Sequence, residues 1–309
     1  MYKRILVPLD GSELAGRALP YAKELANHLG SEVILINVMG SNDNPDNPEH
    51  RVYLNNKVAT MEQVIKKSSA LPPGEKVKVT SAIIGSSGIL THPAEEILDY
   101  AEKEHVSLIV MATHGRTGIK RWALGSTADK VARASQCPIL LIRANIDAPK
   151  NVHLDKILVT LDGSEKSEAV LPHIEYTAPK FKSEINLLNV VEPPYHISIY
   201  QGVGYYGGSG IIKVPYTEEE IKPAKVAAEE YLQKVSGKLI AEGIKTSYKV
   251  RVGSASEEII KAEGEIGVDM VAMSTHGHSG FGRWDHGSIA DKVLHAGNTP
   301  LLLVRPHQH

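Results

Sequence analysis

The sequence contains two copies of one pattern, and this repetition constrains the fold more than any other feature. Residues 4–13 read RILVPLDGSE, and residues 156–165 read KILVTLDGSE. A Thr-His-Gly triplet, at 113–115 and again at 275–277, is followed at the same spacing by Gly-Ser and then by Ala-Asp-Lys-Val. So many matches in constant register indicate a duplicated unit rather than chance similarity. A chain of 309 residues is also long enough for two domains.

Each copy alternates short apolar runs with amphipathic segments, which is the pattern of an α/β domain. In the first copy the apolar runs predict strands at 5–9, 33–38, 77–84, 108–112 and 139–142. The segments between them predict helices at 13–29, 55–68, 93–103 and 126–134. Strands joined by helices run parallel, and the helices cover both faces of the sheet. We therefore expect two tandem doubly wound five-stranded parallel sheets, one in residues 1–147 and the other in residues 154–309.

A proline lies inside the first expected helix of each copy, as Pro20 and as Pro172. Ser12 is the expected N-cap of the first of these helices, so Pro20 falls beyond the first turn. Proline has no backbone N–H and disturbs a helix interior, so we expect a kink at this position.

The segment between the last two expected strands predicts an anion site. It leads from Gly115 to Ser126, at the N-terminus of a helix, where free N–H groups and the helix dipole attract phosphate. The hydroxyls of Ser126 and Thr127 add donors, and Arg116 adds positive charge. Asp10 ends the first strand, where it suits ribose hydroxyls or an adenine edge as an acceptor. Doubly wound sheets bind ligands at these carboxyl ends of strands.

A Gly-Ser pair before a helix is a weak signal when it stands alone, because the same pair often caps a helix and binds nothing. The complete strand–loop–helix context, with Asp10 at a neighbouring strand end, favours a phosphate site over a simple cap.

Three motifs resemble the universal stress protein family. They are VPLDGS at 7–12, PAEEI at 93–97, and IVMATHGRTG at 109–118 followed by LGSTADKV. The resemblance covers nearly the whole chain twice and implies a tandem member of the ATP-binding branch. It implies a Rossmann-like, adenine nucleotide alpha hydrolase-like fold with strand order 3-2-1-4-5 in each copy. The implied ligand is ATP, with ADP or AMP as alternatives and Mg²⁺ accompanying the nucleotide, held by Gly-x2-Gly-x9-Gly-Ser/Thr.

The same resemblance assigns roles to single residues: Asp10 contacts the nucleoside, Val38 lines the adenine pocket, and the glycines and hydroxyls hold phosphates. The nucleotide-binding residues implied in the first copy are Pro8, Asp10, Val38, Ala112, His114, Gly115, Arg116, Gly125, Ser126 and Thr127. Those implied in the second copy are Asp162, Val190, Gly277, Gly287, Ser288 and Ile289. No catalytic residue and no metal ligand is assigned.

The two copies differ where the ligand is expected. Ala112 and Ser274 stand at the place of the motif's first glycine, where a positive φ would be costly for them. In the second copy Ile289 replaces Thr127, and Asp285 brings a carboxylate that would repel a triphosphate. We therefore expect the first copy to be the better nucleotide site.

Two further patterns do not predict sites. The sequence GVGYYG at 202–207 matches a dinucleotide fingerprint, but no helix is predicted after it, and we expect a flexible insertion there. His276, His278, Asp285 and His286 fit no zinc-ligand spacing, so a polar loop is the better interpretation.

Composition restricts the class of protein. The formal net charge is −2, with 23% charged residues, which provides no basic surface for nucleic acid and none for an anionic membrane. The first apolar run is too short for a signal peptide, and the one cysteine, Cys137, cannot form an internal disulfide. We expect a cytoplasmic protein.

We predict a nucleotide-binding stress-response or signalling protein in which occupancy changes conformation or partner binding. No P-loop lysine or dedicated base is visible, so hydrolysis is expected to be slow at most. An interaction module with degenerate sites is one alternative, and an adenylyl-transfer enzyme on the same fold is another. Family members pair domains through their last strand, so residues 139–142 and 301–304 are expected to join the halves as a pseudo-dimer. A homodimer is a further alternative.

Overall fold

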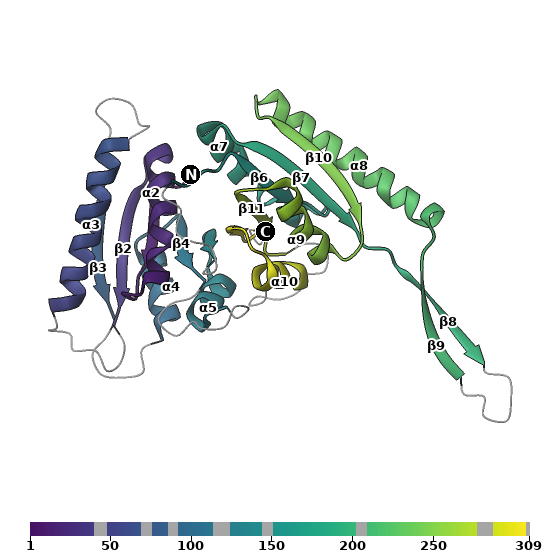
Figure 1. Ribbon diagram of the computed structural model, residues 1–309, viewed down its shortest axis with the longest axis horizontal. Helices are drawn as coiled ribbons and strands as arrows, with labels where there is room; N and C mark the ends of the chain where they lie inside the picture. Colours follow the sequence, from purple (N-terminus) through teal and green to yellow (C-terminus); the bar gives the residue numbers. More distant parts are fainter. Residues whose placement is uncertain are drawn as a thin grey trace.

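The computed structural model describes residues 1–39, 48–68, 76–85, 92–113, 124–143, 151–201, 209–276 and 287–306, and it forms two similar α/β halves (Figure 1). The first half contains β1 (Arg4–Pro8), α1 (Glu13–Gly16), α2 (Ala18–Leu29), β2 (Glu32–Val38), α3 (Pro48–Ser68), β3 (Val79–Ile84), α4 (Pro93–Lys103), β4 (Leu108–Ala112), α5 (Ser126–Ala134) and β5 (Ile139–Ile142). The second half contains β6 (Lys156–Thr160), α6 (Glu165–Glu168), α7 (Leu171–Phe181), β7 (Glu184–Val191), β8 (Tyr195–Gln201), β9 (Ser209–Pro215), α8 (Glu218–Ala241), β10 (Thr246–Val252), α9 (Ala255–Ile266), β11 (Met270–Ser274), α10 (Ser288–Ala296) and β12 (Leu301–Val304).

The strands of both halves form one continuous sheet. Among the described residues its ten strands follow the order β3-β2-β1-β4-β5-β12-β11-β6-β7-β10. Neighbours within each half are parallel, and the predicted order 3-2-1-4-5 is confirmed in both halves. The halves meet where β5 pairs antiparallel with β12, with Leu140 opposite Leu302. The last strands of the two copies therefore join them, as we expected from the resemblance.

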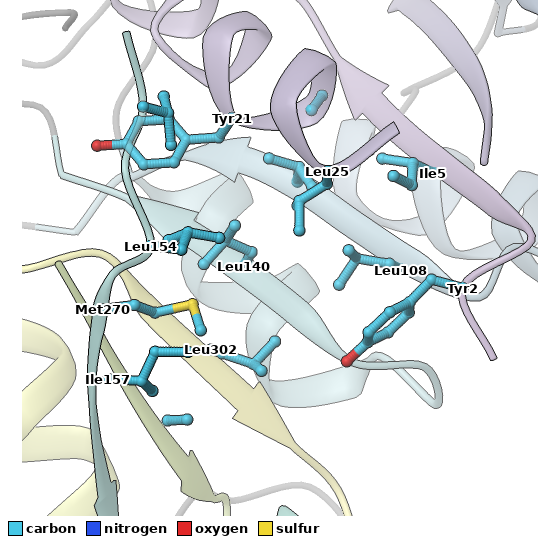
Figure 2. Packing of buried hydrophobic residues seen from close by; sticks show 14 of the residues in the cluster. Tyr2, Ile5, Tyr21, Leu25, Leu108, Leu140, Leu154, Ile157, Met270 and Leu302 are labelled. Carbon is cyan, nitrogen blue, oxygen red and sulfur yellow. The ribbon is translucent and has the colours of Figure 1, made fainter. Parts of the chain in front are cut away.

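Helices cover both faces of the sheet, as the doubly wound pattern predicts. Buried side chains of α2, α3, α7 and α8 pack on one face, and those of α4, α5, α9 and α10 pack on the other. Figure 2 shows Leu25 and Leu140 of the first half packed near Ile157, Met270 and Leu302 of the second. Full burial of one such side chain contributes about 1.5–3 kcal/mol. The halves therefore share hydrophobic cores across their junction.

The first helix of each half differs from the prediction. Instead of one kinked helix, a short helix capped by Ser12 ends before Arg17, and α2 begins at Ala18. Pro20 then lies in the first turn of α2, and Pro172 lies in the first turn of α7. Proline is tolerated there because first-turn N–H groups have no partner within the helix. The chain breaks before the proline rather than bending at it.

The insertion of the second half is a β-hairpin that projects from the body (Figure 1). Its strands β8 and β9 pair antiparallel, from Tyr195 opposite Pro215 to Gln201 opposite Ser209. The sequence analysis predicted neither of these two strands. The GVGYYG pattern at 202–207 lies outside the described residues, and the strand that follows it is incompatible with a dinucleotide turn.

A buried arginine ties the halves together beside β5 and β12. Arg143, only 4% exposed, follows β5 and donates hydrogen bonds to the final carbonyl oxygens of α10. Its Nη2 lies 2.9 Å from the Val293 oxygen, and its Nε lies 3.1 Å from the Thr299 oxygen. Burial lowers the pKa of Arg143 to about 10. Arg305 occupies the related place in the second half, but it approaches the Ser135 oxygen after α5 only to 3.4 Å.

The absence of a side chain at Gly297 lets Arg143 approach the end of α10 closely. A Cβ at Gly297 would lie 2.8 Å from the Val293 oxygen and 2.9 Å from Arg143 Nη2. We expect Gly297→Ala to lower the free energy of unfolding by about 1–3 kcal/mol, because crowded atoms must shift. In urea unfolding, the control Gly237→Ala should instead raise it by about 0.5–1 kcal/mol, because α8 has open space there. A Gly297→Ala protein as stable as wild type would contradict this packing.

The longest helices are polar on much of their surface. Among the residues that the structure describes, none of the helices has both the length and the apolar composition to span a membrane.

Candidate functional site

A cavity of about 230 Å³ lies in the first half, at the carboxyl ends of β1, β2 and β4. The starts of α4 and α5 close its sides. Its lining residues are Pro8, Leu9, Asp10, Ala15, Val38, Pro93, Ile97, Met111, Ala112, Thr113, Gly125, Ser126, Thr127 and Ala128. The structure thus brings together the predicted residues Pro8, Asp10, Val38, Ala112, Gly125, Ser126 and Thr127.

Asp10 is held by the turn that follows β1. Its Oδ1 accepts a hydrogen bond from the Ser12 backbone at 2.9 Å, and Gly11 supplies the positive φ of 84° that the turn requires. Behind it, the Asn37 side chain donates to the Leu9 oxygen at 2.8 Å. The Asp10 carboxylate is therefore held at the end of β1, between the ends of β2 and β4.

The start of α5 forms one end of the cavity. Gly125 is the N-cap and has no side chain to cap the helix, while its N–H donates to the Thr113 oxygen at 2.8 Å. The first-turn N–H groups of a helix have no partner within it, and the helix dipole is positive at this end. With the hydroxyls of Ser126 and Thr127 beside them, these groups suit an anion such as phosphate.

The opposite end of the cavity is apolar. Val38 comes from the end of β2, and Pro93 and Ile97 come from the first turns of α4. Since β1 lies between β2 and β4, Asp10 stands between this apolar end and the helix N-terminus. The arrangement can receive a flat apolar group, a polyol and an anion in that order.

Several predicted residues cannot be placed. His114, Gly115, Arg116 and Gly277 lie outside the described residues, as do His278, Asp285 and His286. Ala112 and Ser274 are strand residues of β4 and β11, and neither has a positive φ. The expected cost of replacing the motif's first glycine is therefore absent.

The second half has a corresponding but larger cavity of about 470 Å³. Its lining residues are Thr160, Leu161, Asp162, Ser167, Leu188, Val190, Glu192, Ala255, Ile259, Met273, Ser274, Thr275, His276, Gly287, Ser288, Ile289 and Ala290. The predicted residues Asp162, Val190, Gly287, Ser288 and Ile289 are among them. Asp162 repeats the Asp10 turn, because its Oδ1 accepts from the Ser164 backbone at 2.9 Å.

The two cavities have different chemical linings. Thr160 and Ser167 replace Pro8 and Ala15, whereas Ile289 removes the hydroxyl of Thr127. The second cavity also contains Glu192, whose Oε1 accepts from the Ala255 backbone N–H at 2.7 Å. Among the described lining residues, the first cavity has one carboxylate and the second has two.

Sequence reasoning missed the apolar walls and Glu192. Pro93 and Ile97 belong to the PAEEI motif, and Ile97 has the spacing of an ordinary core residue. Only the position of α4 over the strand ends turns them into cavity walls. Glu192 is in no motif, and its partner Ala255 is 63 residues away in the chain.

Outside the cavities, one group of described side chains could supply metal ligands: Asp129, Asp291 and His295. Arg133 already donates to both carboxylates, at 2.8 Å to Asp129 and 2.5 Å to Asp291. The group is therefore a charge contact between α5 and α10.

Comparison with known proteins gives the same result for both halves. The model of the universal stress protein family matches residues 1–143 and 153–305. Universal stress protein Slr1230 of Synechocystis is 25% identical over 327 aligned residues, covering 98% of this chain and 100% of the relative. Universal stress protein MJ0531 of Methanocaldococcus jannaschii is 32% identical over 146 residues, covering 46% of this chain and 83% of the relative.

A solved structure of similar fold covers the full chain. The crystal structure of a universal stress protein from Archaeoglobus fulgidus has a TM-score of 0.65 and 19% identity, and 99% of each chain is covered. The likeness includes both halves, in agreement with the two matches to the family model. This chain belongs to the universal stress protein family and carries two of its domains in tandem.

Proposed function

We propose that the chain binds an adenine nucleotide, ATP foremost, in the cavity of the first half. Occupancy of this cavity changes the conformation or the partner binding of a stress-response or signalling protein, with slow hydrolysis at most. The domains are residues 1–147 and 154–309, and the protein works in the cytoplasm.

The observation that carries this proposal is the order of groups along the first cavity. The base packs between Val38, Pro93 and Ile97, and the ribose hydroxyls donate to Asp10. The phosphates receive hydrogen bonds at the start of α5, from Ser126 and Thr127 and the free N–H groups. Mg²⁺ usually binds through substrate phosphates and one or two carboxylates, and Asp10 is the carboxylate that lines this cavity.

A signalling role is supported by the position of α5. Its first turn lines the cavity, and the carbonyl oxygen just after its last turn is approached by Arg305 of the second half. A ligand that moves α5 would therefore alter a contact between halves.

Calorimetric titration with ATP tests the proposal. We expect saturable binding at the first cavity, together with bound nucleotide in native mass spectra of the purified protein. Multiple-turnover assays should show slow hydrolysis at most. Absence of both ATP affinity and co-purified nucleotide would disprove the proposal, and a fast saturable ATPase would disprove its non-enzymatic part.

A further inference from the structure

We propose that the second cavity selects a guanine nucleotide, whose base is recognised by the carboxylate of Glu192. This inference rests on the proposed function, because it takes the second cavity to be a nucleotide site like the first.

The strand order places Glu192 at the base end of the cavity. β6 lies between β7 and β11 in the sheet. Gly287 and Ser288, at the start of α10, form the anion end beyond β11, and Asp162 at the end of β6 lies in the middle. Glu192 directly follows β7, on the far side of Asp162 from α10. With phosphates at α10 and ribose at Asp162, the base reaches Glu192.

The carboxylate of Glu192 is held in place by the neighbouring helix. Its Oε1 accepts the N–H of Ala255, the first residue of α9, at 2.7 Å. A carboxylate has about four lone-pair positions, and this bond uses one of them, so the group can accept further bonds from a ligand.

The carboxylate of Glu192 and the N–H of Ala255 have no counterparts at the corresponding positions of the first half. The residue at the place of Glu192 is Gly40, which has no side chain, and the residue at the place of Ala255 is Pro93, which has no N–H. Both members of the pair are therefore changed together. Among the described lining residues this acceptor belongs to the second cavity, so the two cavities should prefer different bases.

Guanine matches a fixed carboxylate better than adenine does. Its edge presents a ring N–H next to an amino group, and a carboxylate can accept both in parallel, as it does from arginine. Adenine presents one amino group next to a ring nitrogen, whose lone pair faces the carboxylate. Guanine therefore donates two hydrogen bonds to the Glu192 carboxylate where adenine donates one, and bidentate pairs of this kind are stronger and more specific than single bonds.

The lining of the second cavity also suits a more polar base. Its volume is about 470 Å³, against about 230 Å³ in the first cavity. Val190, at the end of β7, lines the cavity on the same side as Glu192. Guanine carries one more polar substituent than adenine.

The test uses the full chain with the first cavity blocked by Ser126→Asp, and titrates GTP and ATP by calorimetry. We expect GTP to bind at least about tenfold more tightly than ATP at the second cavity. Adding Glu192→Gln should weaken GTP binding by about 10–100-fold and change ATP binding by less than about threefold. Glutamine keeps an oxygen for the Ala255 N–H, so the thermal unfolding midpoint should stay close to that of the parent.

Equal affinity for GTP and ATP, or equal losses of both in Glu192→Gln, would overturn the inference, as would the absence of any nucleotide at the second cavity. The proposed function is tested by a separate titration, in which Ser288→Asp blocks the second cavity and ATP binding to the first cavity is measured. Loss of ATP binding there would count against the proposed function itself.

Discussion

Replacing Ser126 with aspartate is expected to lower ATP affinity at the first cavity by at least about 100-fold, or about 2.7 kcal/mol. Ser126 is the first residue of α5 and lines the end of the cavity that suits phosphate. A carboxylate there repels the ligand's phosphates, and like charges brought together at a binding surface cost several kcal/mol. Calorimetric titration measures the loss directly.

The same substitution should leave the fold intact. An acidic residue in the first turn interacts favourably with the helix dipole, by about 0.3–1 kcal/mol. The unfolding midpoint in urea should therefore equal or exceed that of wild type. Ser126→Ala is the matched control, because it removes one hydroxyl without adding charge and should weaken ATP binding by less than about tenfold. If Ser126→Asp binds ATP as wild type does, the nucleotide is not at this helix.

Removal of the Arg143 side chain is expected to lower the free energy of unfolding by about 3–5 kcal/mol, the usual cost of leaving a buried charge uncompensated. Arg143 donates to three backbone carbonyl oxygens around the end of α10. It also lies near Glu263, which is 4% exposed and whose Oε1 accepts no hydrogen bond. Burial raises the pKa of Glu263, and Arg143 opposes that rise. Arg143→Ala therefore leaves a buried carboxyl group without its counter-charge.

Two variants separate this effect from a general loss of packing. Arg305→Ala, at the related place in the other half, removes contacts of 3.4 and 3.5 Å and should cost less than about 1 kcal/mol. The double variant Arg143→Ala, Glu263→Gln should be more stable than Arg143→Ala alone, because the unpaired charge is gone. Urea unfolding of wild type, Arg143→Ala, Glu263→Gln and the double variant gives the coupling energy between Arg143 and Glu263. A coupling energy of zero would show that Arg143 acts only through the carbonyl groups.

The secondary structure was predictable from sequence where the apolar pattern of a short segment matches the element that the segment forms in the fold. β4, α4, α5 and β5 have the predicted bounds, since each is a short apolar or amphipathic segment between clear breaks. The break before Pro20 was missed because a continuous amphipathic pattern masks a change of helix axis. The hairpin of β8 and β9 was missed because glycines and tyrosines at 202–207 dominate that segment, while the pairing depends on residues on either side.

The candidate site was predictable only in part, for a different reason. Asp10, Gly125 and Ser126 follow strands or precede helices in a recognisable motif, so their meeting at one sheet edge could be expected. Ile97 has the same spacing as any core residue, and nothing in the sequence distinguishes a wall of a cavity from packed interior. Glu192 depends on a partner brought near by the fold alone.

The antiparallel pairing of β5 with β12 joins two unlike halves of one chain, so the two cavities occur in a one-to-one ratio. Two unlike domains encoded as separate chains would form like pairs as well as mixed pairs, in proportions set by their concentrations. Within one chain each half meets the other at a high effective concentration, which favours the mixed pair over like pairs. Every molecule therefore carries one cavity of each kind, at any level of expression.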